Sequence, residues 1–221
     1  MPFRIIAVTN RHLSAGDYFE RIGRIASSGA DAVIVREKDL TEDEYLPLAR
    51  RVMEICEAHG TECILHTFAD AAAKLGSRKI HLPLPILRKL SAGVTAAEET
   101  EITREAMTET AAETTGRTGI LGGFDTVGVS VHSRAEAEEA ERLGADYITA
   151  GHIFATDCKK GAEPRGTEFL AGIVSAVSVP VYGIGGISRE NIGFIRETGA
   201  AGACIMSQMM KGDFYEKSDR L

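Results

Sequence analysis

One histidine of this 221-residue sequence follows a run that alternates as a half-buried strand does. Valines occupy positions 127, 129 and 131, whereas Gly128, Ser130 and His132 occupy the alternate positions. Because successive side chains of a strand point to opposite faces, we expect the valines beneath helices and the other row on the opposite face. An imidazole takes up and returns a proton near neutral pH. His132 is therefore a candidate general acid–base and Ser130 a candidate binding residue; the alternative is a histidine with structural hydrogen bonds only.

Two cations follow another apolar run. Arg36 and Lys38 come directly after Ala32–Val35 and share one side-chain parity. Arginine offers a planar fork to phosphate or carboxylate, and lysine offers a compact charge. Both are expected to face one anionic group of a substrate. The alternative is a solvated cluster in which Glu37 and Asp39 are their partners.

Two segments near the C-terminus predict a phosphate site. Gly185 and Gly186 follow one apolar run, and Met206 and Ser207 end or follow another. Glycines let the backbone approach an anion closely, and helix N-termini attract negative charge. We expect a phosphate against the backbone of Gly185, Gly186 and Ser207, with Met206 beside it.

A polar, basic segment, residues 151–161, lies between these two groups of candidates in the chain. It has the composition of a loop that could close over a substrate. Thr156 and Lys159 are candidate anion ligands, whereas Lys160 is interpreted as a surface residue.

Histidines end two further runs. His66 and Thr67 follow one of them, and His81 lies in the next. His66 is a candidate substrate contact, and the alternative for it is a buried, hydrogen-bonded role. For His81 the buried, hydrogen-bonded role is the preferred interpretation.

The candidates above lie at the ends of short apolar runs that alternate with amphipathic segments. This order predicts parallel strands with helical crossovers. Eight runs favour a single α/β domain, a (β/α)₈ TIM barrel, over a doubly wound open sheet, because no G-x-G-x-x-G turn follows the first run. The runs are Phe3–Val8, Ala32–Val35, Glu62–Leu65, Lys79–Leu82, Thr126–Val131, Tyr147–Ala150, Val181–Ile184 and Gly202–Met206.

Several helices are signalled between the runs. Apolar residues from Tyr45 to Cys56 follow helical spacing. Ser133 and Glu136 form a capping-box pattern, and Ser188 is expected to begin a helix. One segment, residues 91–123, is rich in Thr, Glu and Ala and is interpreted as a polar surface insertion, with a lid or an oligomer contact as the functional alternative.

Composition excludes several classes of protein. The formal net charge of −7 argues against a general nucleic-acid or membrane-surface binder. The four cysteines show no zinc-site or disulfide spacing, and no apolar stretch reaches membrane-spanning length. We expect a cytoplasmic enzyme, with a homo-oligomer left open.

Together the motifs resemble the superfamily of thiamine phosphate synthases and thiazole tautomerases. The resemblance rests on Arg36-Glu-Lys38, residues 128–133, the Gly-x-Ile-Phe-x-Thr loop with Lys159, and residues 184–187, which occur in the family's order. It covers nearly the whole chain outside residues 91–123.

The two branches of the superfamily differ at a metal site. The synthases carry Asn-Asp after the third strand and an Asp after the fourth, which hold Mg²⁺ for a pyrophosphate leaving group. This sequence has His66-Thr67 and His81-Leu-Pro-Leu-Pro85 there, and Mg²⁺ prefers carboxylate oxygens. Asp70 lies nearby but is expected to belong to the following helix. No metal is therefore expected, and Mg²⁺ would be needed only by a synthase.

Residues 128–133 and 151–161 are similar to the tautomerase branch, often called TenI-like. The resemblance implies aromatisation of a phosphorylated carboxythiazole in thiamine biosynthesis, with His132 moving a ring proton to the exocyclic carbon and no cofactor. The first alternative is a thiamine phosphate synthase, a transferase that joins hydroxymethylpyrimidine pyrophosphate to thiazole phosphate. The second is a catalytically silent metabolite-binding or regulatory protein.

Overall fold

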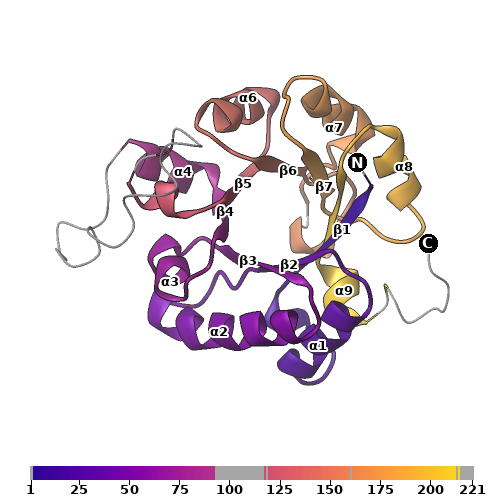
Figure 1. Ribbon diagram of the computed structural model, residues 1–221. Coiled ribbons are helices and arrows are strands. Elements are labelled where there is room, and N and C mark those ends of the chain that lie inside the picture. The colour runs from indigo at the N-terminus through magenta and orange to yellow at the C-terminus, as the bar shows by residue number, and fades with distance from the viewer. Residues whose placement is uncertain (1, 93–116, 118, 160, 213, 215–221) are drawn as a thin grey trace.

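The protein folds as a closed barrel of eight parallel strands in the order β1 to β8 (Figure 1). The computed structural model describes residues 2–92, 117, 119–159, 161–212 and 214. Every neighbouring pair of strands is parallel, including β1 with β8, which closes the barrel. The predicted (β/α)₈ TIM barrel is confirmed, and each predicted strand is present to within one residue at either end. The strands are β1 (Arg4–Val8), β2 (Ala32–Val35), β3 (Glu62–His66), β4 (Lys79–Pro83), β5 (Thr126–Val131), β6 (Tyr147–Gly151), β7 (Val181–Ile184) and β8 (Gly202–Ile205).

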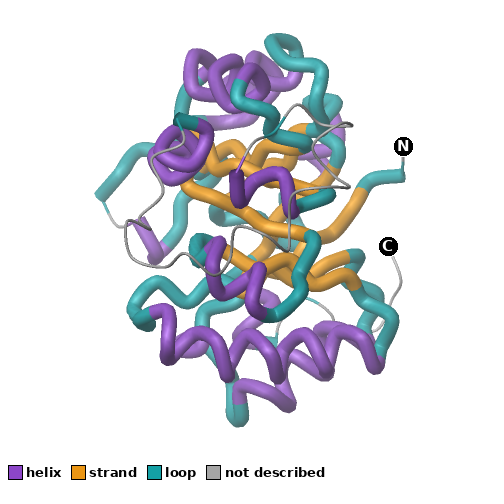
Figure 2. Tube along the Cα trace, turned by 60° about the vertical axis from the view of Figure 1, so that its left-hand side comes forward, coloured by secondary structure: helices purple, strands orange, loops and turns teal. Residues whose placement is uncertain are grey.

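Helices surround the strands, as the view along the barrel and the turned view both show (Figures 1 and 2). In the described part of the chain they are α1 (Tyr18–Ser27), α2 (Glu42–Ala58), α3 (Ala69–Lys74), α4 (Leu84–Ser91), α6 (Arg134–Arg142), α7 (Gly166–Val174), α8 (Ile192–Glu197) and α9 (Ser207–Lys211). Short 3₁₀ turns are η1 (Arg11–Leu13), η2 (Gly119–Gly123) and η3 (Asp157–Lys159).

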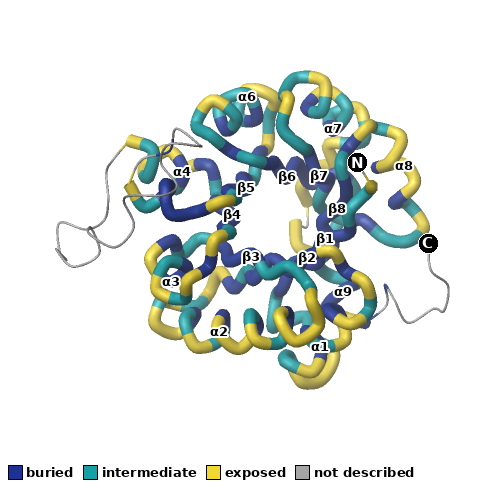
Figure 3. The backbone as a smooth tube through the Cα atoms, viewed as in Figure 1, coloured by how far each residue is buried: buried dark blue, intermediate teal, exposed yellow. Residues whose placement is uncertain are grey.

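Side-chain parity divides the apolar residues into two cores. Val33, Val35 and the three valines of β5 pack between strands and helices. Ile34, Tyr147 and other residues of opposite parity fill the barrel interior. The strands are accordingly buried, as the dark ring in Figure 3 shows. The alternation at residues 127–132 predicted this division between helix-facing and interior side chains. Arg36 and Ser130 have the interior parity and therefore point into the barrel.

Side-chain caps begin three of the described helices, α1, α2 and α6. Thr41 and Glu44 form a reciprocal capping box at α2. At α6, Ser133 accepts from the Glu136 N–H, but the Glu136 carboxylate accepts from the His132 N–H, one residue before the cap. The prediction that Ser188 begins a helix is wrong. Its N–H donates to the Asn191 side chain in a preceding turn, and α8 begins only at Ile192.

Most of the predicted insertion at 91–123 lies outside the described residues, but its final part belongs to the fold. The turn η2 contacts α3 and α4, and Leu121 within it is buried. Arg117 is also buried and donates hydrogen bonds to the carbonyls of Gly144 and Phe124. The polar excursion therefore ends before Arg117. Among the described helices, none is long and apolar enough to cross a membrane.

Candidate active site

A cavity of about 940 Å³ opens at the carboxyl ends of the strands, the end at which barrel enzymes place their chemistry. The predicted site residues, which come from widely separated parts of the chain, all line it. They are Arg36, Lys38, His66, Ser130, His132, Thr156, Lys159, Gly185, Gly186, Met206 and Ser207. The structure thus brings these residues together, although lining a cavity does not by itself assign a role.

The ring of His132, at the end of β5, is oriented by a hydrogen bond to the backbone. Its Nδ1 lies 2.9 Å from the carbonyl oxygen of Gly151 at the end of β6. A carbonyl only accepts, so Nδ1 carries the hydrogen and the neutral ring presents a lone pair at Nε2. Among the described residues, Nε2 has no hydrogen-bond partner. The ring can therefore act as a base on a group in the cavity.

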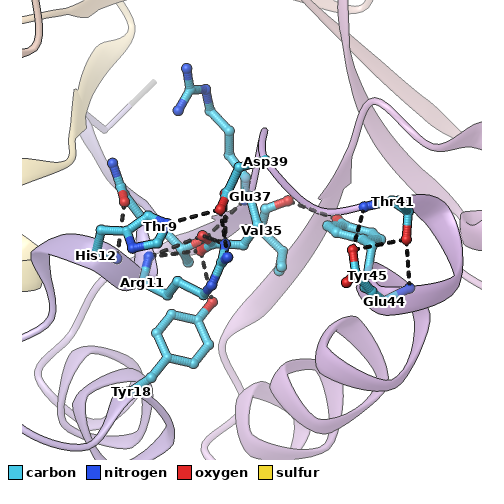
Figure 4. Close-up of polar contacts among 12 residues, drawn as sticks. Thr9, Arg11, His12, Tyr18, Val35, Glu37, Asp39, Thr41, Glu44 and Tyr45 are labelled. Carbon is cyan, nitrogen blue, oxygen red and sulfur yellow. Dashed lines mark hydrogen bonds and ion pairs between the residues drawn. The ribbon is translucent and has the colours of Figure 1, made fainter.

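Arg36 and Lys38 line the cavity. The two acids beside them in the chain, Glu37 and Asp39, bind other residues (Figure 4). Glu37 accepts a hydrogen bond from the Thr9 hydroxyl, and Asp39 pairs with Arg11. Within the described chain, neither cavity-facing cation has an acidic partner. Glu37 and Asp39, the partners considered in the alternative interpretation, therefore make their hydrogen bonds to Thr9 and Arg11.

The surroundings of Arg36 and Lys38 disfavour the charged form of both side chains. Burial lowers the pKa of Arg36. The charge of Arg36 lowers the pKa of Lys38, and burial and Lys159 add to the effect. An anion placed among these three groups would relieve the repulsion, so the cluster suits an anionic ligand.

The floor of the cavity is a polar network inside the barrel. His66 is buried beside His81, with ring centroids 5.4 Å apart. The Tyr147 hydroxyl has His81 Nδ1 as its one partner among the described residues, at 3.0 Å, so its proton is assigned to that nitrogen. His81 Nε2–H then donates to Ser130 Oγ at 2.7 Å. This agrees with the predicted hydrogen-bonded role of His81, and it fixes Ser130 below the cavity mouth.

Both histidines of the floor are held neutral. Burial lowers the pKa of His81 to about 3, and the charge of Arg36 contributes. Burial likewise lowers the pKa of His66 well below its usual value, with His81 as the next cause. The floor therefore offers neutral hydrogen-bonding groups rather than charges.

The glycine turn after β7 contacts the loop after β6. Gly185 and Gly186 have φ of +100° and +65°, a region that side chains other than glycine rarely adopt. The Phe154 N–H donates to the Gly185 carbonyl. A Cβ on Gly186 would lie 2.4 Å from the carbonyl oxygen of Ala155. Ser207 begins the short helix α9, whose N-cap residue Met206 makes no side-chain cap.

Sequence reasoning missed several residues of the cavity wall. Thr149 follows Tyr147 by two positions in β6, so the parity argument used for Ser130 would have found it. Glu136 was seen only as a helix cap. Gln208 has a buried Oε1 with no partner among the described residues, and no pattern in the sequence marked it.

The positions that correspond to the magnesium ligands of the synthases do not fit that ion. His66 is neutral, and its Nδ1 is within hydrogen-bond distance of the Thr67 hydroxyl. Pro83 and Leu84 line the cavity after β4, and the exposed Asp70 lies in α3 outside the cavity wall. Magnesium prefers carboxylate and phosphate oxygens, which these side chains do not supply. In the described part of the chain, no three His, Cys, Asp or Glu residues cluster as a metal site.

Comparison with known proteins agrees with the superfamily that the motifs indicated. The family model described as thiamine monophosphate synthase matches residues 5–111 and 108–209. A thiamine-phosphate synthase of Syntrophomonas wolfei is 29% identical over 225 residues, covering 99% of this chain and 93% of that protein. A putative thiamine-phosphate synthase of Geobacter sulfurreducens is 30% identical, covering 95% and 88%.

A solved structure gives the same result. The thiamine phosphate pyrophosphorylase of Pyrococcus furiosus superposes with a TM-score of 0.69 at 26% identity, covering 95% of this chain and 88% of that one. These relatives carry the name of the transferase, the first alternative raised by the motifs, and none of the three is named a tautomerase. The chain belongs to the thiamine monophosphate synthase family.

Proposed function

We propose that this member of the family is an isomerase that aromatises a phosphorylated carboxythiazole by moving one proton. The observation that carries the proposal is the orientation of His132. Its Nδ1–H is bound to the Gly151 carbonyl, and Nε2 remains for a substrate in the cavity. That arrangement suits a residue that takes a proton from one carbon and returns it to another.

The remaining site residues are assigned to binding. Gly185, Gly186 and Ser207 would hold the phosphate with backbone N–H groups, with Met206 beside it. Arg36, Lys38 and Lys159 supply positive charge for the anionic groups of the substrate, and Thr156 adds a hydroxyl. Ser130 and His66 contact the substrate from the cavity floor.

In the proposed reaction, His132 removes the ring proton and redelivers it to the exocyclic carbon. One base performs both transfers if both carbons present the same face to Nε2. The conjugated ring spreads the charge that develops between the two transfers, so no organic cofactor is required. The side chains around His132 would exclude water and hold the ring in place during the exchange.

The second candidate is the transferase reaction of a thiamine-phosphate synthase. The names of the relatives favour it. The chemistry of His66, Thr67 and Pro83 opposes it, because the transferase of the resembled branch depends on Mg²⁺ held by carboxylates at these positions.

Two assays on the wild-type protein separate the candidates. The first supplies the carboxythiazole phosphate tautomer and follows ultraviolet absorbance and deuterium incorporation, with EDTA present. The second supplies hydroxymethylpyrimidine pyrophosphate and thiazole phosphate, with and without Mg²⁺, and measures pyrophosphate release. We expect turnover in the first assay and none in the second. Pyrophosphate release that EDTA abolishes and Mg²⁺ restores would replace the isomerase with the synthase.

A further inference from the structure

We propose that Glu37 and Thr9 are positioning residues that fix Arg36 and Lys38 toward the cavity. The inference rests on the proposed anion-binding role of these two cations. Neither Glu37 nor Thr9 lines the cavity, so any influence on a ligand passes through the residues that they hold.

The Glu37 carboxylate is buried outside the cavity wall and points toward Thr9, Arg11 and Tyr18 (Figure 4). It accepts from the Thr9 hydroxyl at 2.7 Å and from the Tyr18 hydroxyl at 3.2 Å. The Arg11 N–H donates to both of its oxygens, at 3.1 and 3.0 Å. The carboxylate thus ties the first residues of the β2–α2 loop to the segment after β1.

Thr9 connects this anchor to Arg36. Its side chain is fully buried, and its Oγ accepts from the Arg36 N–H at 2.9 Å while its hydroxyl donates to Glu37. One hydroxyl therefore fixes the backbone at residue 36 and the side chain at residue 37. Glu37 is thereby held outside the cavity, while its two neighbours in the chain, Arg36 and Lys38, line the cavity wall.

A carboxylate suits this position better than an amide. The donors around Glu37 are two hydroxyls and the Arg11 N–H, with the Arg11 guanidinium at 3.5 Å. A glutamine would keep one oxygen as acceptor and turn its own NH₂ toward donors. Charge matters as well, because burial lowers the pKa of Arg36 and the negative charge of Glu37 opposes that effect.

Asp39 offers a matched control in the same loop. It also pairs with Arg11, at 2.6 Å, and lies within 2.9 Å of His12. Unlike Glu37, its side chain is half exposed, and within the described chain it makes no hydrogen bond or ion pair with Thr9 or Arg36. Glu37→Gln and Asp39→Asn therefore remove one negative charge each from neighbouring positions of one loop.

The experiment measures binding of inorganic pyrophosphate by nuclear magnetic resonance titration, so it does not depend on which reaction the protein catalyses. We expect Glu37→Gln and Thr9→Val each to weaken pyrophosphate binding about tenfold, the usual worth of one hydrogen bond to a charged group. Asp39→Asn should bind within about twofold of wild type. In a background of Arg36→Gln with Lys38→Gln, adding Glu37→Gln should cost less than about twofold, because the residues through which it acts are gone.

The outcomes separate this inference from the proposed function. If Arg36→Gln with Lys38→Gln binds pyrophosphate as well as wild type, the anion-binding role assigned to both cations fails. If that variant weakens binding but Glu37→Gln and Thr9→Val do not, the positioning role alone fails. The positioning role also fails if Glu37→Gln weakens pyrophosphate binding equally in the wild-type protein and in the variant with Arg36→Gln and Lys38→Gln. Should Glu37→Gln not fold, Thr9→Val alone and with the double substitution gives the same comparison.

Discussion

His132 owes its proposed role to its surroundings rather than to its identity. The Gly151 carbonyl selects the ring tautomer, and Glu136 accepts from the His132 backbone N–H. The end of β5 and the start of α6 therefore hold both the backbone and the ring. A side chain held at two points in this way loses little entropy when a substrate arrives, which favours efficient proton transfer.

We expect His132→Asn to leave the barrel folded and to lower tautomerisation by roughly 10²–10⁴-fold, the usual worth of a positioned general acid–base. Asparagine keeps a polar side chain of similar volume but cannot carry a proton between carbons. Turnover measured by ultraviolet absorbance, alongside the melting temperature, checks this. Near-normal turnover of the variant with a lowered melting temperature would show that His132 is structural. If the wild-type protein binds the substrate without any turnover, a silent metabolite-binding protein is favoured instead.

The glycine turn after β7 supplies a second prediction at this scale. Gly186→Ala should raise the KM for a phosphorylated substrate, because a Cβ there would lie 2.4 Å from the Ala155 carbonyl oxygen and 2.7 Å from that of Phe154. With φ at +65°, the strained backbone should also cost about 1–3 kcal/mol of stability.

Gly193→Ala is the control for this substitution. It lies in α8 with no heavy atom within 4 Å of the added carbon, so it should stabilise the protein by about 0.5–1 kcal/mol and leave KM unchanged. Michaelis constants and urea unfolding of both variants test the pair. A Gly186→Ala enzyme with the wild-type KM would contradict the phosphate assignment.

At the scale of single residues, side-chain parity along the strands explains which cavity residues could be predicted from the sequence. A strict period of two placed Ser130 and Arg36 inside, and the structure agrees. The same rule could not find the partners of Glu37, since Thr9 follows β1, Arg11 begins η1 and Tyr18 begins α1. Their proximity depends on the pairing of β1 with β2, which brings Val8 level with Ile34. Short-range patterns carry no information about such pairings.

At the scale of elements, strands were predicted more accurately than the starts of helices. A buried strand in a parallel barrel is a short apolar run, so its ends coincide with the first polar residues. The turn before α8 shows why the helix start was misplaced. Asn191 accepts from the Ser188 N–H and donates to the Gly186 carbonyl, so residues 188–191 complete the glycine turn instead of starting the helix.

The segments that lead into β5 and β6, at the opposite, amino-terminal end of the barrel, carry a buried charge. Arg117 forms an ion pair with Asp146 and donates to the carbonyls of Gly144 and Phe124. We expect Arg117→Met to lower the free energy of unfolding by about 3 kcal/mol, because it leaves buried acceptors without a donor. Catalysis at the other end of the barrel should be unchanged.

The exposed pair of Arg78 and Asp125 provides the control. These two side chains also form a double hydrogen bond, at 3.0 and 2.6 Å, but both are about half exposed. Arg78→Met should therefore cost no more than about 1 kcal/mol. Urea unfolding of the two variants measures both losses in the free energy of unfolding. Equal losses would mean that burial of Arg117 adds nothing to its contribution to stability.

At the scale of the whole molecule, the barrel interior changes from apolar to polar along its axis. Ile6, Ile34 and Ile64 fill part of it, while His66, His81 and Ser130 lie toward the cavity. A closed barrel without the polar groups would be simpler to pack. Neutral histidines at this level instead give the cavity a hydrogen-bonding floor, and they make folding depend on pH.

We expect the protein to lose stability progressively as the pH falls from about 6.5 toward 3. The pKa of His81 is lowered to about 3 by burial and by Arg36, and that of His66 is lowered well below its usual value by burial, His81, Arg36 and Lys38. In the unfolded chain both histidines bind a proton below about pH 6.5. The unfolded state therefore binds more protons across this window, and acid favours unfolding. Well below pH 6.5, each histidine should contribute a slope of about 1.4 kcal/mol per pH unit.

Urea unfolding at intervals between pH 7 and pH 5 measures this slope, in a range where few carboxylates have begun to bind protons. His81→Gln should be less stable than wild type at pH 7, because Ser130 and Tyr147 lose a partner, yet its stability should change less steeply with pH. His59→Gln, at an exposed position after α2, should keep the wild-type slope. The explanation fails if His81→Gln and wild type lose stability in parallel, because the buried histidine would then contribute nothing to the proton uptake on unfolding.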